Sequence, residues 1–422
     1  MDHFQYRSGT LHAEDVSIAS IADQVGTPFY CYSTATMSRH YRVFRDAFGE
    51  LPVTIHYAVK ANSNFAVLRT LANLGSGADV VSGGELKLAI RAGIAPRDIV
   101  FSGVGKSIDE LKEAIRLGVG QINIESEPEL ESISRITSAA GRTVRVAIRV
   151  NPDVAAGTHH KITTGTKENK FGVDWTLAPG IYRRATSLPG LAATAIAVHI
   201  GSQITDLRPL ESAFLRVRDL TQMLRHDGIA IDHLDLGGGL GVPYKASNEV
   251  PPTPADYAAM VRRTVGELGC RLSFEPGRLI VANAGIMVSR VLIVKDSIAR
   301  RFLIVDAAMN DLIRPAMYDA HHDIVPIAAT SHGTSLTDYD VVGPVCESSD
   351  KFASDVALPP LAAGELIAFR SAGAYGAVMA STYNMRPLIP EVLVDGNRWA
   401  VVRRRPTMDE MLALESLPDW LN

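Results

Sequence analysis

The chain has 422 residues, of which 46% are hydrophobic and 21% are charged, and its 42 Lys and Arg nearly balance its 46 Asp and Glu. This length predicts two or three domains, and the composition is that of a folded rather than a disordered chain. The formal net charge of −4 argues against a nucleic-acid-binding protein, because such proteins usually carry a strongly basic face.

The N-terminus, the apolar runs and the cysteines bear on the location of the protein. The first residues lack a basic stretch followed by an apolar one, and no apolar run reaches the roughly 18 residues that a membrane helix needs. The three cysteines are too few for a disulfide framework and form no CxxC zinc motif. We therefore expect a soluble, cytoplasmic enzyme without a membrane partner.

The N-terminal 35 residues contain a helix-like segment, 17–25, and a strand-like segment, 27–33. Between Val53 and Pro276, short β-rich runs alternate with longer helix-like ones, which is typical of a parallel sheet. Eight such units in about 220 residues favour a closed (β/α)8 TIM-like barrel over an open doubly wound sheet. The expected strands cover 53–59, 78–82, 99–102, 121–125, 144–150, 194–200, 233–237 and 271–275. The expected helices cover 64–74, 84–92, 108–117, 127–139, 209–226 and 254–268, and Ser107 and Ser126 precede two of them as candidate caps.

After Gly285 the pattern changes to strand-like runs with little helix between them. This predicts a second, mostly β domain of the sandwich or barrel-like kind. On this pattern alone, the N-terminal segment can belong to either domain. The expected strands cover 286–294, 301–308, 323–329, 337–343, 365–370 and 398–404.

The ends of the barrel strands carry a chemically rich set of residues. In such a barrel, function lies at the C-terminal ends of the strands. An amine, an imidazole, carboxylates and a glycine run therefore meet at one rim. The residues at or next to the expected strand ends are Lys60, Asp79, Ser102, Glu125, Asn151, His199, Gly237–Gly239 and Glu275.

Three of these features together predict a site for pyridoxal 5'-phosphate. A lysine that leaves an apolar strand, as Lys60 does, can be desolvated, which lowers its pKa and frees the amine as a nucleophile. The glycine run 237–239 is typical of a loop that binds phosphate through backbone N–H groups, and Glu275 can pair with a protonated ring nitrogen. His199 can stack on the ring. Each feature alone also has a plainer interpretation: a lysine capping a strand, a tight turn, and a core histidine.

Other patterns do not meet the requirements of the sites they resemble. Val242 replaces the last glycine of a dinucleotide fingerprint, and Val100 replaces the first glycine of a P-loop that would end in Gly105-Lys106-Ser107. Two groups of possible metal ligands lack a firm ligand spacing, so we expect solvated polar loops there and no metal. These groups are His159-His160 and the cluster Asp319, His321, His322 and Asp323.

Longer stretches of the chain resemble a known enzyme family. HYAVKAN, GADVVSGGEL, HIGSQ, DLGGGLG, EPGR and GAYG resemble motifs of the diaminopimelate decarboxylases, nearly end to end, and RPAMYDA together with CESSD is more specific to that family. EPGR and the glycine run are shared across the wider alanine-racemase-like, ornithine-decarboxylase-like group of pyridoxal phosphate enzymes (fold type III). The resemblance implies a cofactor-binding barrel over 36–284. It also implies a β domain over 1–35 plus 285–422 that carries substrate and dimer contacts.

The resemblance also implies roles for individual residues. Lys60 would form the Schiff base with the cofactor, beside His199, and Glu275 would keep the ring protonated. Cys346 would return a proton to the α-carbon, from the partner subunit of a homodimer with shared active sites. The residues implied to hold the cofactor are Lys60, Asp79, His199, Ser202, Gly238, Gly239, Glu275, Pro276, Gly277, Arg278 and Tyr375. Those implied to bind the substrate are Arg278, Arg314, Tyr318, Glu347 and Tyr375.

The implied activity is decarboxylation of meso-2,6-diaminopimelate to L-lysine and carbon dioxide, the last step of lysine biosynthesis. Arginine binds a carboxylate through two hydrogen bonds, and losing a charged hydrogen bond costs about 1.5–3 kcal/mol, which disfavours substrates with one carboxylate. Two alternatives remain open: a sister decarboxylase for ornithine, arginine or a carboxylated polyamine, and a non-catalytic homologue. In plainer interpretations, Arg314 and Glu347 form weak salt bridges and Cys346 is a buried structural cysteine.

Overall fold

The computed structural model describes residues 2–155, 170–245, 250–331 and 333–421, and the chain divides into two compact units. The β unit contains residues 1–37 and 281–422 together with Tyr244 and its neighbours. The barrel unit contains Ser38–Pro243 and the segment that ends at Ile280. Within the described residues, no helix is long and apolar enough to cross a membrane.

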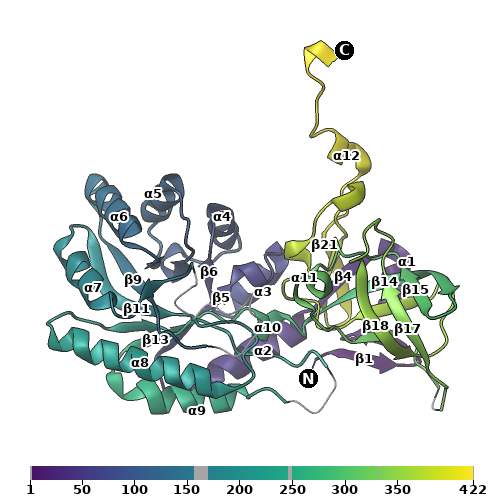
Figure 1. The fold of residues 1–422 in the computed structure, drawn as a ribbon, viewed down its shortest axis with the longest axis horizontal. Helices are drawn as coiled ribbons and strands as arrows, with labels where there is room; N and C mark the ends of the chain where they lie inside the picture. The colour runs from purple at the N-terminus through teal and green to yellow at the C-terminus, as the bar shows by residue number, and fades with distance from the viewer. Residues whose placement is uncertain (1, 156–169, 246–249, 332, 422) are drawn as a thin grey trace. The chain divides into compact units, whose positions relative to one another are not determined.

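The barrel unit is built on a closed ring of eight parallel strands (Figure 1). Each strand pairs with the next one along the chain, and pairing of β8 with β9 and of β13 with β5 completes the ring. All eight predicted strands are present, and the closure excludes the open doubly wound sheet. The strands are β5 (Val53–Ala58), β6 (Gly77–Val80), β7 (Ile99–Phe101), β8 (Gln121–Ile124), β9 (Val144–Asn151), β11 (Leu191–Val198), β12 (His233–Asp235) and β13 (Arg271–Phe274), with the short β10 (Val173–Asp174) added to β9.

Each barrel strand leads into a helix on the outside of the ring, as Figure 1 shows for α5 to α9. Ser107 caps α5 through a capping box with Glu110, as predicted, but Ser126 precedes α6 without a side-chain cap bond. The sequence pattern missed α7. The helices are α2 (Thr34–Asp46), α3 (Phe65–Asn73), α4 (Gly83–Arg91), α5 (Ile108–Leu117), α6 (Glu127–Ala140), α7 (Ala178–Ser187), α8 (Leu207–His226), α9 (Pro254–Val265) and α10 (Arg278–Val281).

The β unit is organised around one long strand, β14 (Gly285–Asp296). Its first half pairs with β4 (Phe29–Ser33) and β19 (Leu366–Phe369), and its second half pairs with β15 (Arg301–Val305). The N-terminal strand β4 therefore lies inside a sheet made mostly of C-terminal residues. The predicted runs after Gly285 all contain strands, whereas β18 and β20 were not predicted. The remaining elements are β1 (Phe4–Arg7), β2 (Thr10–Ala13), β3 (Val16–Ser17), α1 (Ile18–Val25), α11 (Arg314–Tyr318), β16 (Ile324–Pro326), β17 (Thr337–Val342), β18 (Lys351–Leu358), β20 (Glu391–Asp395), β21 (Arg398–Arg403) and α12 (Met408–Leu412).

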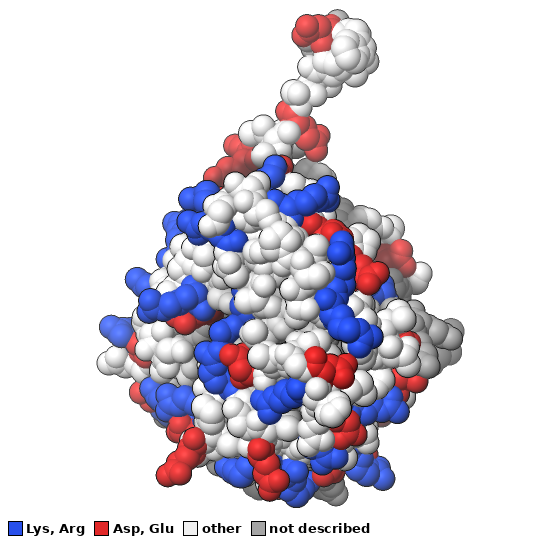
Figure 2. Space-filling model, turned by 90° about the vertical axis from the view of Figure 1, so that its left-hand side faces the viewer, with Lys and Arg blue, Asp and Glu red and all other residues white. Residues whose placement is uncertain are grey.

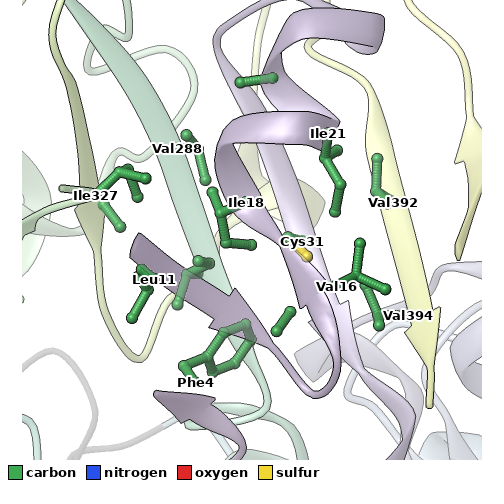
Figure 3. Packing of buried hydrophobic residues seen from close by; sticks show 14 of the residues in the cluster. Phe4, Leu11, Val16, Ile18, Ile21, Cys31, Val288, Ile327, Val392 and Val394 are labelled. Atoms are coloured by element: carbon green, nitrogen blue, oxygen red, sulfur yellow. The ribbon is translucent and has the colours of Figure 1, made fainter. Parts of the chain in front are cut away.

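One core of the β unit joins the two ends of the chain (Figure 3). Ile18 and Ile21 on α1 pack with Cys31 on β4, Val288 on β14 and Val392 on β20, all of them buried. Burying such side chains contributes roughly 1.5–3 kcal/mol each, which is enough to hold the N-terminal segment on this sheet.

Charged side chains of both signs lie interspersed on the face that Figure 2 shows. The net charge of −4 is thus not gathered into a single acidic field on that face.

Candidate active site

Lys60 lies at the rim of the barrel, in a short 3-10 turn directly after β5. Its Nζ lies 2.6 Å from Oδ2 of Asp79 on β6. The Asp79 side chain is fully buried, whereas 39% of the Lys60 side chain is exposed. The second carboxylate oxygen of Asp79 is buried without a hydrogen-bond partner among the described residues. A buried carboxylate therefore holds the amine at the strand end. A lysine that merely caps a strand would not need such a buried partner.

Four polar side chains from β8, from β12 and from the residue after β7 form a network with Glu275. Asn123 on β8 donates from Nδ2 to Ser102 Oγ at 3.1 Å and to Asp235 Oδ2 at 3.1 Å. It also reaches Glu275 Oε1 at 3.4 Å, as does the Ser102 hydroxyl. Gln121 donates to Asp235 Oδ2 at 3.3 Å. The network fixes the Glu275 carboxyl directly after β13.

The protonation of these acids follows from their burial and their proximity. Burial, followed by the negative charges of Asp235 and Asp79, raises the pKa of Glu275 well above its usual value, against the opposing effect of Lys60. Burial likewise raises the pKa of Asp235 to about 6, although the hydrogen bond from Asn123 opposes this shift. Because the ionised form of each of these two buried acids is disfavoured, this rim can hold a proton at neutral pH.

His199 directly follows β11 and is linked to the glycine run. The Gly238 N–H donates to His199 Nδ1 at 3.3 Å, which leaves the ring proton of the neutral imidazole on Nε2. Burial, then the positive charges of Arg149 and Lys60, lower the pKa of His199 well below its usual value. The ring is therefore neutral at pH 7.

Glycine is required in the run that follows β12. Gly237 and Gly239 have φ of 65° and 109°, a region that other residues rarely adopt. A Cβ on Gly238 would lie 2.4 Å from the Glu275 carbonyl oxygen. The run is thus the tight turn of the plainer interpretation, and it also brings backbone close to Glu275.

The segment after β13 meets the segment after β11. Arg278 is buried and donates from Nη2 to Ser202 Oγ at 3.1 Å. Gly277 packs so closely that an added Cβ would lie 2.8 Å from the Ala61 Cβ, next to Lys60. Pro276, which lies between Glu275 and Gly277 in the chain, is also buried. The structure therefore brings together all the predicted residues of the barrel unit at one rim.

Asn123, Asp235 and Arg149 belong to this rim, but sequence reasoning did not select them. Arg149 on β9 is paired with Glu125 at 2.9 Å. Asn123 lies one position before the end of β8, Arg149 lies two positions before the end of β9, and Asp235 is the last residue of β12. That signal was present in QINIE, HLDLG and VRVAIRV.

In the β unit, Arg314 and Tyr318 lie at the two ends of α11. Arg314 is buried, with 6% of its surface exposed, and Tyr318 is half-buried. Arg314 Nη1 lies 2.8 Å from His322 Nε2, and its guanidinium carbon lies 4.5 Å from the centre of the Tyr244 ring. These two partners are uncharged aromatic groups, and Arg314 is not a surface arginine.

Cys346 and Glu347 lie in the loop between β17 and β18. Asp350 anchors this loop through its side chain. One carboxylate oxygen accepts the N–H of Val345 in the loop, and the other accepts the N–H of Met309, each at 2.7 Å. Cys346 itself is exposed, so its interpretation as a buried structural cysteine was wrong. Glu347 accepts hydrogen bonds from Ser349, which lower the pKa of its carboxyl, and it forms no ion pair with any described residue.

Tyr375 follows β19 and is half-buried, with φ of 56°. The next residue, Gly376, is held against Tyr30, whose hydroxyl would lie 2.8 Å from an added Cβ. A residue other than glycine with positive φ is uncommon, and such residues cluster at functional sites.

The candidate metal cluster after α11 is not the solvated loop that we expected. His321 is exposed and pairs with Asp323 at 2.7 Å, but His322 is only 3% exposed. No group of ligands suited to a metal ion is present among the described residues, and His159-His160 lies outside them.

The donors at the barrel rim fit pyridoxal phosphate. An aldehyde needs an amine, which Lys60 supplies, and a pyridine nitrogen needs an acidic partner, which Glu275 supplies. The unpartnered Asp79 oxygen gives a further buried acceptor beside the amine. Ser202, Arg278 and the backbone of the glycine run are donors of the kind that bind phosphate.

Comparison with known proteins agrees with this assignment of chemistry. Residues 34–282 match the family described as "Pyridoxal-dependent decarboxylase, pyridoxal binding domain". The chain is 48% identical over 419 residues to the diaminopimelate decarboxylase of Vibrio cholerae serotype O1, and the match covers 99% of both chains.

Two solved structures are similar over nearly the whole chain. One is diaminopimelate decarboxylase from Helicobacter pylori complexed with L-lysine, with a TM-score of 0.90 and 40% identity over 94% of this chain and 98% of that one. The other is the enzyme from M. jannaschii, also in complex with L-lysine, with a TM-score of 0.95 and 34% identity over 100% of this chain and 99% of that one.

Proposed function

The chain belongs to the diaminopimelate decarboxylases, a family of pyridoxal-phosphate-dependent enzymes, and we propose that it converts meso-2,6-diaminopimelate to L-lysine and carbon dioxide with the residues described above. The resemblance inferred from the motifs is thereby confirmed, as are the cofactor and the decarboxylase activity. The observation that carries the proposal is the Lys60 amine, held by the buried Asp79 at the same rim as the Glu275 carboxyl.

We assign the binding of the cofactor to the barrel rim. Lys60 would bond to the cofactor aldehyde, and Ser202, Gly238, Gly239 and the segment 276–278 would hold its phosphate, together with Tyr375 of the β unit. When bound, pyridoxal phosphate supplies an electron-accepting ring that stabilises the carbanion left after a carboxylate departs as carbon dioxide. His199, neutral because of its lowered pKa, would lie against the ring without adding charge.

Glu275 would keep a proton at the ring nitrogen. Its raised pKa favours a protonated carboxyl in the absence of a cationic partner, and a ring nitrogen beside it could take over that proton. The hydrogen bonds from Asn123 and Ser102 orient the carboxyl for this task. Asp235 shares the Asn123 amide with Glu275 and also accepts a hydrogen bond from Gln121.

We assign substrate recognition to Arg278, Arg314, Tyr318, Glu347 and Tyr375. The two arginines would each bind a carboxylate, because guanidinium matches carboxylate geometry through two parallel hydrogen bonds. The Glu347 carboxyl stays ionised because of its lowered pKa, and it would pair with the distal ammonium. The burial of Arg278 and Arg314 supports this assignment. A buried guanidinium without an anionic partner is costly, so a ligand that lacks the carboxylate binds less well.

Cys346 would protonate the α-carbon after carbon dioxide has left. Its thiol is exposed, and Asp350 fixes the backbone of its loop. A proton donor that serves the site of another subunit has to be exposed and held in place in this way. We propose a homodimer in which Cys346 and Glu347 of one subunit serve the other subunit's site. We also propose a cytoplasmic location, which is supported by the absence of disulfides among three free cysteines.

The activity is tested by mixing the purified, cofactor-loaded protein with a substrate panel and measuring carbon dioxide release. Diaminopimelate should be decarboxylated with L-lysine as the product. Ornithine, arginine and a carboxylated polyamine should react at least about tenfold less efficiently, because each leaves an arginine without its carboxylate. Faster turnover of any of these three would instead indicate a sister decarboxylase. A cofactor spectrum that changes on addition of diaminopimelate, without carbon dioxide release, would indicate a non-catalytic homologue.

A further inference from the structure

Arg314 has a defined orientation because two aromatic groups contact it. His322 Nε2 lies 2.8 Å from its Nη1, and the ring of Tyr244 lies against the guanidinium, 4.5 Å from its central carbon. The Tyr244 and His322 rings are themselves in edge-to-face contact, with centres 5.5 Å apart and planes at 82°. The hydrogen bond to His322 fixes the edge of the guanidinium, and the contact with the Tyr244 ring fixes its plane.

The hydrogen bonds of His322 define its protonation state. Arginine has only donors, so His322 Nε2 must accept the hydrogen bond from Arg314 and carries no proton. The other nitrogen, Nδ1, lies 2.8 Å from the Arg370 carbonyl oxygen and must therefore donate. His322 is a neutral imidazole with its proton on Nδ1. Because both nitrogens are engaged, it is not available as a metal ligand.

The sheet of the β unit places His322 at this position. His322 lies two residues before β16, and Arg370 directly follows β19, to which β16 is paired antiparallel. The Arg370 N–H donates to the Asp323 carbonyl oxygen at 2.8 Å and so extends the ladder by one step. The imidazole is therefore held by backbone on one side and can fix the position of a side chain on the other.

We propose that His322 is a positioning residue for substrate recognition: it holds the Arg314 guanidinium in the plane and rotation that bind a substrate carboxylate. This inference rests on the proposed function, in which Arg314 binds the substrate. Two-point binding of a carboxylate depends on the plane of the guanidinium. A histidine is suited to the task because a neutral acceptor orients the arginine without neutralising it, whereas an aspartate or glutamate would compete with the substrate for the same charge.

The test compares two amides that differ by one methylene group. In His322→Asn the amide nitrogen can still donate to Arg370, as Nδ1 does, but the side chain is too short to accept from Arg314. In His322→Gln the longer side chain can reach Arg314 with its oxygen. We expect KM for diaminopimelate to rise about tenfold in the Asn variant, and less than about threefold in the Gln variant, with kcat within about twofold of wild type in both.

His321→Gln is the matched control, because it removes a neighbouring imidazole that is exposed and pairs only with Asp323 in the contacts described above. Its KM should equal that of the wild type. His322→Phe keeps the ring and removes both nitrogens, and it should raise KM at least as much as the Asn variant. If the Phe variant fails to fold, the comparison of Asn with Gln still decides.

A double-mutant cycle with Arg314→Ala separates positioning from a general structural effect. If His322 acts through Arg314, His322→Asn should raise KM about tenfold in wild type and have no further effect in the Arg314→Ala protein. A further rise of similar size in the Arg314→Ala background would overturn the inference. So would an unchanged KM in the Asn variant while Arg314→Ala raises KM. If Arg314→Ala itself leaves KM unchanged, the substrate role of Arg314 in the proposed function is wrong, and the inference is wrong with it.

Discussion

Replacing Lys60 should produce two effects that can be separated, because this residue has both a chemical and an electrostatic task. Lys60→Ala removes the amine that would bond to the cofactor, and it also removes the cation that lies 2.6 Å from the buried Asp79 carboxylate. Lys60→Arg removes only the first, because guanidinium keeps the charge but does not form a Schiff base. Both variants should lose the borohydride-reducible chromophore.

The stability effect should follow charge alone. Removing one partner of a buried pair costs about 3–5 kcal/mol, but 39% of the Lys60 side chain is exposed, so water replaces part of the lost interaction. A value near that of a lost charged hydrogen bond, about 2 kcal/mol, follows for Lys60→Ala. Lys60→Arg should cost less than about 1 kcal/mol, and adding Asp79→Asn to Lys60→Ala should recover most of the loss.

The measurement is urea unfolding of the cofactor-free proteins, with the chromophore followed separately after cofactor is added. Equal stability of Lys60→Ala and wild type would show that the ion pair with Asp79 contributes nothing. A chromophore that borohydride can still reduce in Lys60→Arg would show that another amine bonds to the cofactor. Either result refutes the corresponding half of the reasoning.

Three further predictions concern other parts of the molecule. Cys346→Ala should lower kcat about a hundredfold while leaving the cofactor spectrum unchanged, and normal turnover would mean that another group is the acid. Asp350→Asn should lower the free energy of unfolding by about 1–2 kcal/mol and lower kcat, because an amide can accept only one of the two N–H groups that now bind its oxygens; an unchanged kcat would show that the loop does not need this anchor. Burial lowers the pKa of His56 to about 4, so only the unfolded chain gains a proton as pH falls below about 6.5, and stability falls with pH until about 4. When the pH is lowered from 7.5 to 5.5, the free energy of unfolding should therefore fall by about 1 kcal/mol less in His56→Gln than in the wild type. An equal fall in both proteins, measured by urea unfolding, would contradict the assignment.

The barrel was predictable because its signal is local. Each strand is an apolar run of a few residues followed by a helix with its own caps, and eight repeats of that unit leave few other folds. The helix α7 escaped prediction because its segment, APGIYRRATS, has proline and glycine in its first turn and few apolar residues. In the β unit, β18 escaped because its alternation is interrupted by Ser354 and Asp355 and only Phe352 and Leu358 are buried.

The candidate site was predictable in part. Lys60, Asp79, His199 and Glu275 could be found because they stand at or next to the ends of apolar strands, and a parallel barrel brings all such ends to one rim. Asn123 and Asp235 were missed because they lie within the expected strands 121–125 and 233–237, where a polar residue can equally belong to a sheet edge or to a buried network. His322 was assigned to a solvated loop because two histidines and two aspartates in five residues are typical of an exposed segment.

The sequence by itself determined the barrel, the change to β structure after Gly285, the cofactor and the family, since each depends on residues near one another in the chain. Only the tertiary structure decided how residues distant in the chain act on one another. It set Asp79 against Lys60, assembled Asn123, Asp235 and Glu275 into one proton-holding network, and turned His322 back onto Arg314. The physical reason is that protonation states and side-chain orientations depend on burial and on neighbours across strands, which no local pattern contains.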